Sequence, residues 1–464
     1  MLNAELQQLE KEITRIRDKA SEFGLDFFDM RFEICPAEVL YTFGAYGMPT
    51  RFSHWSFGKA YHRLKTQYDY NLSRIYELVI NSDPCYAFLL DTNSLIQNKL
   101  VAAHVFAHND FFKNNWRFRN TSRWMVESMA SSAERIRRYE IQHGRQTVEA
   151  FLDAVMSISE HVDPFGRAKK QPVTEKETLL PVSPYEDLWS IGVKEPEKTA
   201  TKVKKIPAEP ERDLLLFIME HARDLEDWQR DIISILRDEM LYFRPQMETK
   251  IMNEGWATYW HVRIMREIDL SDEEMLEFAR MHAGVIHPSR LYINPYLLGL
   301  KIFEDIERRW DNPSEEERKK YGRPGGEGRQ KIFEVRETET DVSFIRNYLT
   351  KELVEELDLY LYKKVGYQWK VVEKDWEKVR DGIAESLTNC GIPYIVVIDG
   401  DYNRSGELYL RHEYEGVELD SIHAHKTLEH LYTLWGRPVH LETVFDNRKY
   451  LLSYNGKNPF RIAI

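Results

Sequence analysis

This sequence has few cysteines, no long apolar run and no excess of positive charge. The cysteines are Cys35, Cys85 and Cys390, too few and too widely spaced for a disulfide framework or a four-cysteine zinc site. This usage is typical of a reducing compartment, and we expect a cytoplasmic protein. No stretch approaches the ~20 apolar residues that a membrane span needs. The charged N-terminal segment MLNAELQQLEKEITRIRDKA does not have the pattern of a signal peptide.

The charge balance argues against a general nucleic-acid-binding protein. The formal net charge is -12 at pH 7, whereas such proteins usually present a basic face to the phosphates. Hydrophobic residues make up 42% of the chain and aromatic residues 12%, which indicates a folded chain with extensive cores. At ~150 residues per domain, the 464 residues predict two or three domains.

Three common nucleotide-binding and hydrolase motifs are also missing. The sequence has no GxxxxGK[ST] loop, no GxGxxG after a predicted strand and no GxSxG elbow. We therefore do not expect a P-loop nucleotidase, a dinucleotide-binding Rossmann domain or an α/β-hydrolase.

Helical periodicity is what the first two thirds of the chain do contain. Apolar residues recur at helical spacing at 1–20, from Tyr61 to about Asn81, and through much of 91–160. Helical spacing returns at Leu214 and continues, with breaks, to about residue 310. We therefore predict a mainly α protein with one large helical domain.

The predicted domain ranges follow changes of pattern along the chain. Residues rich in Pro, Lys and Glu with little periodicity predict a linker or a wrapping arm, and a charged, Gly-rich stretch predicts a loop. In chain order we predict an N-terminal helical domain at 1–162, the linker at 163–212, helices that complete the first domain at 213–310, the loop at 311–330 and a small C-terminal α+β domain at 331–464. The predicted strands of that last domain are Tyr394–Asp399, Leu408–His412 and Val439–Phe445, and its predicted helix is Ser421–Leu434, ended by Gly436.

Two histidines on one predicted helix are the first candidates for chemistry. In LVAAHVFAHNDFFKNN, His104 and His108 are four residues apart, so their side chains share a helix face. That face also carries Leu100 and Phe111, so both imidazoles point towards the core. Two imidazoles at this spacing commonly bind zinc or a similar metal. The alternative is a pair of core histidines with ordinary hydrogen bonds.

A second predicted helix offers two more metal-binding groups. In ETKIMNEGWATYWHVRIM, Glu254 and His261 are seven residues apart and share a face with apolar residues. A carboxylate on an apolar stripe is costly to bury unless it is paired or bound to a metal. We therefore predict a metal site formed by His104, His108, Glu254 and His261, most readily for Zn, although Fe, Mn or Ni would also suit these ligands.

This pair of helices resembles the zinc site of the gluzincin metallopeptidases, with one departure. Those peptidases carry a glutamate directly after the first histidine as the general base, and here that residue is Val105. The predicted substitutes are Asp110 and Glu127, with Glu134 as a further candidate, and Tyr259 is a predicted donor to a substrate oxygen. For Glu127 and Glu134, a solvent-facing position on their helix is the alternative.

A Gly-, Pro- and aromatic-rich segment near residues 35–60 is the candidate substrate-binding loop. Arg51, His54 and Trp55 are its predicted substrate contacts. A purely structural role for this loop is the alternative.

Three long strings give the chain a family resemblance. RFEICPAEVLYTFGAYGMPTRFSHWSFGKAYHRLK, DPCYAFLLDTNSLIQNKLVAAHVFAHNDFFKNN and MNEGWATYWH together resemble the stage V sporulation protein R family. The resemblance implies a role in forming the spore cortex, the peptidoglycan layer of the endospore. It also implies partners, since relatives are often encoded beside a serine protein kinase and a von Willebrand-type domain protein.

Two functions remain open at this point. One is a metal-dependent hydrolase that acts in cortex formation. The other is a non-catalytic regulator or scaffold that works with the kinase and the von Willebrand-type partner. An open metal coordination position would favour the enzyme, and a closed four-ligand site would favour the regulator.

Overall fold

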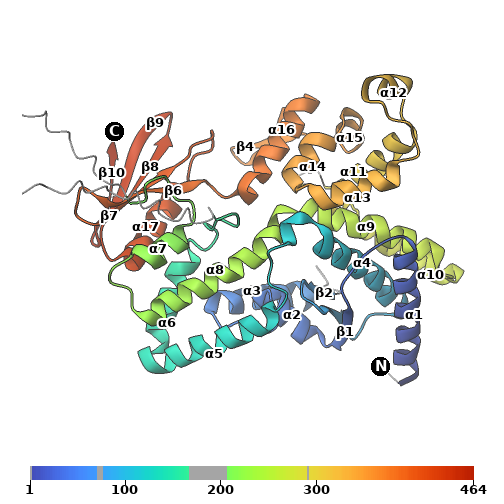
Figure 1. Ribbon diagram of the computed structural model, residues 1–464, viewed down its shortest axis with the longest axis horizontal. Coiled ribbons are helices and arrows are strands. Elements are labelled where there is room, and N and C mark those ends of the chain that lie inside the picture. Colours follow the sequence, from blue (N-terminus) through green and yellow to red (C-terminus); the bar gives the residue numbers. More distant parts are fainter. Residues whose placement is uncertain (1–2, 70–76, 167–205, 290–291) are drawn as a thin grey trace, which may run out of the picture. The chain divides into compact units, whose positions relative to one another are not determined.

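The computed structural model of the chain describes residues 3–69, 77–166, 206–289 and 292–464 (Figure 1). The chain divides into two compact units, each assembled from two stretches of sequence. Unit 1 consists of Met1–Glu149 and Leu241–Ile392, and unit 2 of Ala150–Met240 and Pro393–Ile464. Unit 2 is thus partly inserted within the sequence of unit 1.

Unit 1 is mainly helical. Its helices before the insertion are α1 (Asn3–Glu22), α2 (Ala37–Tyr46), α3 (Trp55–Asp69), α4 (Leu95–Asn114), the 3-10 helix η1 (Trp116–Phe118) and α5 (Met125–His143). Those after it are α9 (Lys250–Glu267), α10 (Asp272–Val285), α11 (Pro295–Asp311), α12 (Glu315–Tyr321), α13 (Gly328–Thr338), α14 (Asp341–Tyr348), α15 (Lys351–Glu356), α16 (Trp376–Leu387) and η3 (Thr388–Gly391). Helices α6 (Arg145–Met156) and α8 (Asp227–Glu248) span the sequence boundaries between the units.

Unit 1 also contains two small sheets. The first has the order β1-β3-β2, where β1 (Met30–Cys35) is parallel to β3 (Cys85–Leu90) and β2 (Glu77–Ile80) is antiparallel to it. Alternate residues of β2 and β3, among them Val79, Ala87 and Leu89, pack against Val101 and Val105 of α4. This sheet therefore supports one face of α4. The second sheet is the hairpin of β4 (Leu361–Val365) and β5 (Gln368–Glu373).

Helices α4, α9 and α11 form the centre of unit 1, and α9 packs between the other two. The contact between α9 and α11 depends on two glycines, because a Cβ atom on Gly255 would lie 2.3 Å from the Cα of Gly299. The start of α9 is capped by Asp341, whose carboxylate accepts hydrogen bonds from the backbone N–H groups of Ile251 and Met252 at 2.8 and 2.9 Å. Both features fix the position of α9.

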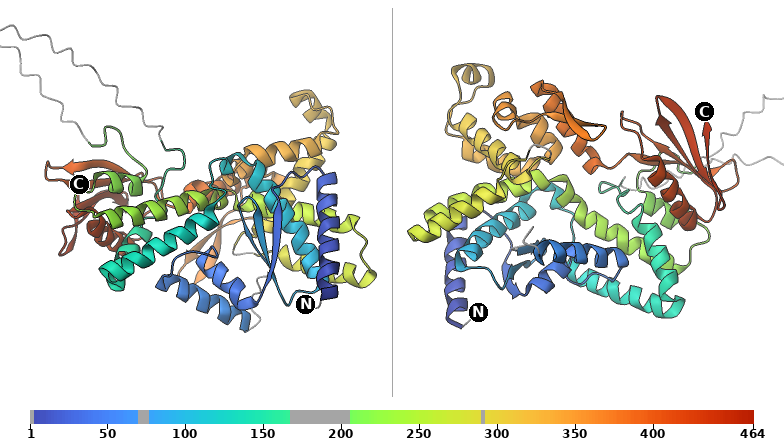
Figure 2. Two further views of the ribbon diagram at one scale, coloured as in Figure 1. Left: turned by 60° about the horizontal axis from the view of Figure 1, so that its bottom comes forward. Right: turned by 180° about the vertical axis from the view of Figure 1, so that it is seen from behind.

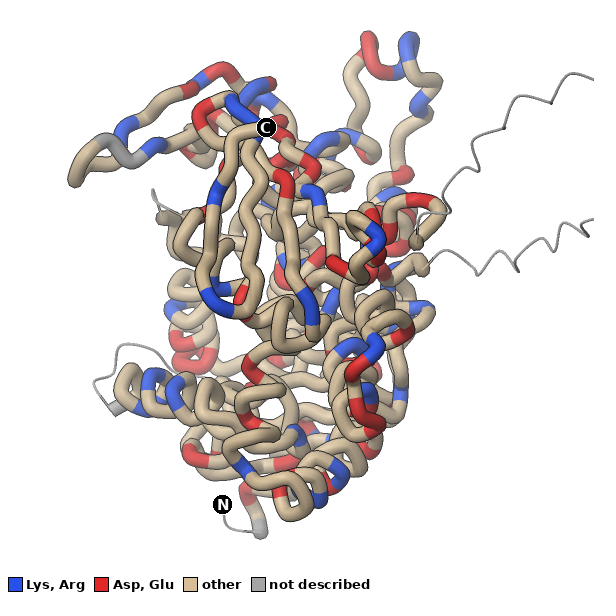
Figure 3. The backbone as a smooth tube through the Cα atoms, turned by 90° about the vertical axis from the view of Figure 1, so that its left-hand side faces the viewer, with Lys and Arg blue, Asp and Glu red and all other residues tan. Residues whose placement is uncertain are grey.

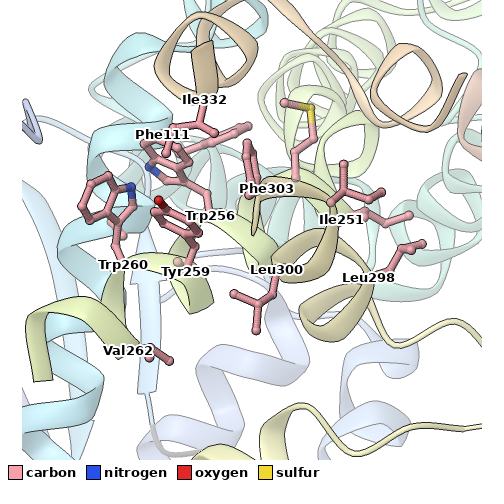
Figure 4. Close-up of a cluster of buried hydrophobic side chains, with 14 of the residues drawn as sticks. Phe111, Ile251, Trp256, Tyr259, Trp260, Val262, Leu298, Leu300, Phe303 and Ile332 are labelled. Carbon is pink, nitrogen blue, oxygen red and sulfur yellow. The ribbon is translucent and has the colours of Figure 1, made fainter. Parts of the chain in front are cut away.

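The main core of unit 1 is aromatic on one side of α9. Trp256, Tyr259 and Trp260 lie beside Phe303 of α11 (Figure 4). All four side chains are buried, with ring centroids 5.2 Å apart for Trp256 and Phe303. Aromatic side chains fill this side of α9. Glu254 lies on the opposite side of the helix and faces His104 and His108 of α4.

Unit 2 is a small α+β unit. Its sheet has the order β10-β9-β8-β7-β6 and consists of β6 (Ile395–Tyr402), β7 (Glu407–His412), β8 (Val439–Phe445), β9 (Arg448–Tyr454) and β10 (Pro459–Ala463). The parallel pair β7 and β8 is connected through α17 (Ser421–Trp435), which packs on β8 and β9 (Figure 2). Helix α7 (Leu214–His221) contacts β6, and its Phe217 stacks on Trp435 with centroids 5.8 Å apart.

The structure confirms a mainly helical protein with a small C-terminal sheet. The predicted C-terminal strands correspond to β6, β7 and β8, and α17 ends at Gly436, which has a φ of 79° as a left-handed C-cap. The sequence-based ranges begin the C-terminal domain at 331, whereas the compact unit that holds the sheet resumes at Pro393. Most of the predicted linker, 167–205, lies outside the described residues.

Two local predictions were wrong. The helix expected from Tyr61 to about Asn81 is present as α3 up to Asp69, and residues 70–76 lie outside the described residues. Residues 77–80 form β2 instead of the end of that helix. The helical pattern of apolar residues covers only a short stretch there. Residues 77–80 form a strand because they pair with β3. The segment predicted as a loop at 311–330 contains α12, whose start is fixed by a capping box between Ser314 and Glu317.

No helix within the described residues is long and apolar enough to cross a membrane. Acidic and basic residues alternate over short distances along the described chain, as Figure 3 shows from one side.

Candidate metal centre

The histidine pair lies in the middle of a well-anchored helix. A capping box fixes the start of α4: Ser94 accepts a hydrogen bond from the N–H of Gln97, and the side chain of Gln97 accepts one from the N–H of Ser94. About three and four turns further along the buried helix, the side chains of His104 and His108 are 4% and 6% exposed. Their burial on one face agrees with the sequence prediction.

Three potential ligand atoms converge between α4 and α9. The Nε2 atoms of His104 and His108 lie 3.1 Å apart, and Oε2 of Glu254 lies 3.7 and 3.4 Å from them. Among the described residues, these three side chains form the one group whose possible metal ligands all lie within 4.8 Å of one another. Two nitrogens bound to one tetrahedral zinc at ~2.0–2.1 Å would lie about 3.3 Å apart, close to the observed separation.

Both imidazoles are held by hydrogen bonds at their other nitrogen. Nδ1 of His108 lies 2.8 Å from Oδ1 of Asn253, so its proton points to the amide and Nε2 faces Glu254. Nδ1 of His104 lies 3.0 Å from Nδ1 of His261, and Nε2 of His261 lies 3.0 Å from Nδ1 of His282. If each neutral ring donates outwards, His104 keeps the lone pair of its Nε2 free for a ligand.

His261 is therefore placed behind the three converging atoms. The sequence predicted it as a fourth ligand, and the structure instead has it hydrogen-bonded to the ligand candidate His104. Around protein-bound metals, the second nitrogen of a ligand imidazole is commonly hydrogen-bonded to a neighbouring group. Three protein ligands would leave one position of a tetrahedral metal ion for substrate or water.

The electrostatics of the centre favour a carboxylate at Glu254 and neutral imidazoles at His104 and His261, whereas they favour the charged form of His108. Burial would raise the pKa of Glu254, but its interactions with His104 and His108, whose Nε2 atoms lie 3.7 and 3.4 Å from Oε2, outweigh this and hold its pKa well below the usual range. Burial lowers the pKa of His104, and His108 lowers it further. Burial also lowers the pKa of His261, well below its ordinary value. For His108, burial is outweighed by Glu254, so its pKa is raised.

These residues fit a divalent metal ion. Oε2 of Glu254 is buried and has no hydrogen-bond partner among the described residues, and unsatisfied buried acceptors are rare in folded proteins. A cation between the three atoms would supply that partner. Two imidazoles and one carboxylate are a donor set that zinc binds readily.

Two side chains that the sequence did not suggest also face this centre. Glu77 of β2 interacts electrostatically with His108 and Glu254, and burial raises its pKa to about 7. The ring of Tyr296, in the first turn of α11, stacks on His104 with centroids 6.1 Å apart. Burial raises the pKa of Tyr296, and the nearby Glu254 and Glu77 raise it further.

The predicted general bases occupy other surroundings. Asp110 is fully buried; its oxygens accept hydrogen bonds from the N–H of Asp26 and from Nε1 of Trp256, both at 2.8 Å, and Arg336 lies 3.6 Å away. Burial raises its pKa to about 6, with Arg336 opposing the rise. Glu127 is exposed on α5, and Tyr259 lies in the aromatic core (Figure 4).

The predicted substrate contacts lie around the start of α3. Arg51 donates to the backbone oxygen of Tyr46, covers the ring of Phe57 and lines a cavity of about 500 Å³ beside α5. His54 is buried with Nδ1 2.7 Å from Oγ of Ser56, and Trp55 is 55% exposed. Among them, Arg51 is the one that lines this cavity, together with Glu134, Arg137 and Glu140 of α5.

Unit 2 contains a line of three groups that superficially suggests a serine hydrolase. His440 lies 2.7 Å from Oγ of Ser453 and 2.9 Å from Oε2 of Glu407, on neighbouring strands. Ser453 is completely buried, so its hydroxyl is inaccessible to a substrate. These contacts satisfy the buried imidazole and stabilise the sheet.

Comparison with known proteins agrees with the resemblance seen in the sequence. A family model described as "SpoVR like protein" matches residues 3–392, and one described as "SpoVR-like C-terminal domain" matches residues 393–446. The division between them coincides with the start of the second stretch of unit 2. A protein of Escherichia coli (strain K12) with the name "Uncharacterized protein YcgB" is 31% identical over 469 residues, covering 93% of this chain and 90% of the relative. No solved structure matches the chain.

Proposed function

The chain belongs to the SpoVR family, and from this premise we propose that it is a sporulation-related, metal-dependent hydrolase that acts in forming the spore cortex. Its proposed metal site consists of His104, His108 and Glu254, with zinc as the metal. The observation that carries the proposal is the convergence of two Nε2 atoms and Oε2 of Glu254 within 4.8 Å. The cortex is peptidoglycan, which contains amide bonds that such a site could cleave.

The surrounding residues hold the proposed ligands in their positions before a metal ion binds. Asn253 holds His108, His261 holds His104, and the close contact of Gly255 with α11 fixes the helix that carries Glu254. A bound zinc ion would act as a Lewis acid that polarises a carbonyl group. The chain's own residues orient the ligands, and they favour the neutral imidazole of His104 and the carboxylate of Glu254, the forms that bind metal.

The second candidate is a non-catalytic regulator that works with a serine protein kinase and a von Willebrand-type partner. The observation in its favour is Val105, which occupies the position of the gluzincin base. Its side chain is buried in an apolar cluster with Val101 and Leu89. On this account, the metal or polar cluster would only join α4 to α9.

Metal content of the purified full chain tests the proposal. Elemental analysis after reconstitution with Zn, Fe or Mn should find about one equivalent in the wild type. His104→Ala and Glu254→Ala should abolish it, while His62→Ala, an exposed histidine of α3, should not. Absence of metal from the wild type would refute the enzyme and favour the regulator.

A further inference from the structure

We propose that Glu77 and Tyr296 complete the centre as its proton acceptor and its hydrogen-bond donor, and that the group they act on is an amide carbonyl. This inference rests on the metal-dependent hydrolase function proposed above. Glu77 would take the role of the glutamate that the gluzincins carry after their first histidine. It would do so from a strand rather than from the histidine helix.

The alternation of β2 places Glu77 towards α4. Val79 packs with Val101 and Val105 of α4 in one apolar cluster, whereas Leu78 packs in a different cluster. Successive side chains of a strand point to opposite faces. Glu77 therefore points to the same side as Val79, towards α4.

Along α4, the same helix face continues to the metal centre. His108 lies seven residues after Val101 and three after Val105, so the three share one face. The charges of Glu77, His108 and Glu254 interact. Glu77 is nevertheless not in the group whose ligand atoms lie within 4.8 Å of one another. Glu77 therefore lies on the side of β2 that faces the histidine-bearing face of α4, from which it would accept a proton from an attacking water.

Tyr296 reaches the centre from a third helix. Asn294 caps α11 by accepting hydrogen bonds from the N–H groups of Tyr296 and Leu297, which fixes the first turn. The phenol ring stacks on His104 at an interplanar angle of 25°. Its hydroxyl group lies near enough to Glu254 and Glu77 for both to raise its pKa. A carboxylate and a neutral phenol therefore face the ligands from different elements.

This pair of groups suits amide hydrolysis. An O–H bond of the attacking water breaks, its proton passes to a carboxylate oxygen of Glu77, and the water oxygen bonds to the carbonyl carbon. The carbonyl oxygen gains negative charge, and the hydroxyl of Tyr296 donates a hydrogen bond to it. The C–N bond then breaks, and the leaving nitrogen takes the proton from Glu77. The products are a carboxylic acid and an amine, and both side chains return to their starting states.

Acetohydroxamic acid is a probe for this arrangement that requires no known substrate. It binds a metal through its two oxygens, gives up a proton to a nearby base and accepts a hydrogen bond. The test is a spectral titration of the cobalt-loaded full chain with this compound. Glu77→Gln should retain the wild-type metal content but bind the probe at least about tenfold more weakly, and Tyr296→Phe about fivefold more weakly.

Matched controls come from the same part of unit 1. Glu33→Gln on β1, the other edge strand of the same sheet, and Tyr292→Phe, whose side chain is 72% exposed, should leave probe binding unchanged. Glu77→Asp, which keeps a shorter carboxylate, should fall between wild type and Glu77→Gln and guards against a folding defect.

The outcomes separate this inference from the proposed function. Unchanged probe affinity in both Glu77→Gln and Tyr296→Phe would overturn the inference and leave the metal site standing. Loss of metal from Glu77→Gln would also overturn it, because Glu77 would then be a ligand. A wild-type chain that takes up no cobalt or zinc would refute the hydrolase function and this inference with it.

Discussion

Nδ1 of His104 lies 3.0 Å from Nδ1 of His261, so one imidazole of the centre is oriented by another on the facing helix. We expect His261→Asn to bind one equivalent of zinc with an affinity about 10–100-fold weaker than that of the wild type, because His104 loses its orienting partner. Competition with a zinc-chelating dye measures this. His62→Asn is the control. A His261→Asn chain with no zinc at saturation would instead identify His261 as a direct ligand, as the sequence predicted.

The close approach of Gly255 to Gly299 leads to a second prediction. Gly255→Ala should lower the free energy of unfolding by about 1–3 kcal/mol. The new Cβ would lie 2.3 Å from the Cα of Gly299, so α9 and α11 would have to separate. It should also weaken metal binding, since Glu254 precedes this residue. Chemical denaturation and metal titration check both effects.

A second glycine gives the control for that experiment. A Cβ on Gly284 of α10 would meet nothing within 4 Å. Gly284→Ala should therefore be neutral or stabilising by up to ~1 kcal/mol, through helix propensity alone. Equal effects of the two substitutions would contradict the packing argument.

The free energy of unfolding should fall as pH rises from about 4 to about 7. Burial raises the pKa of Asp341 from 3.8 to about 7, against its hydrogen bonds from the N–H groups of Ile251 and Met252. A group whose pKa is higher in the folded than in the unfolded state favours folding below its unfolded pKa, and that contribution is lost as pH rises through the folded pKa. Between about pH 4 and pH 7 the loss should be on the order of 2–4 kcal/mol.

Denaturant unfolding at pH 5 and pH 8 tests this pH dependence. Asp341→Asn retains one acceptor but cannot ionise, so it should reduce the difference between the two pH values. Asp272→Asn, an exposed substitution at the start of α10, should leave the difference as in the wild type. A wild-type chain that is more stable at pH 8 than at pH 5 would show that other groups dominate.

Asp110 should prove structural in a direct comparison. Asp110→Ala removes the acceptor of Trp256 and the partner of the buried Arg336, so we expect a loss of about 3–5 kcal/mol of unfolding free energy. Metal content at low temperature should remain. Glu127→Gln, at an exposed site of α5, should change neither property. Full stability of Asp110→Ala combined with loss of hydrolysis would restore Asp110 as a catalytic candidate.

The sequence predicted those parts of the centre that depend on local spacing. His104, His108 and Glu254 could be found because residues on one face of a helix recur at fixed intervals, and the apolar neighbours show which face is buried. Metal binding by these residues stays a prediction. The family could be identified because long strings around the same helices resemble known sequences.

Glu77 and Tyr296 could not be predicted in this way. Glu77 belongs to a four-residue strand that follows a helical pattern, and only its pairing with β3 shows which way it points. Tyr296 reaches His104 because Gly255 and Gly299 let α9 and α11 approach closely. Asp110 was a candidate base because it is close in sequence to His108. Its contacts Trp256 and Arg336, however, come from helices that are distant in the chain. Such long-range contacts leave no local pattern.

The insertion of one stretch of unit 2 between the two stretches of unit 1 has a consequence for biosynthesis. Helix α4 is synthesised well before α9 and α11, with residues 150–240 between the two stretches. Contacts between residues so far apart in the chain form late, because the loop between them must first be closed. During synthesis on the ribosome, His104 and His108 are therefore present before Glu254 and the other residues of the centre. Metal acquisition should be a late step in the maturation of this chain, after residue 296 has emerged.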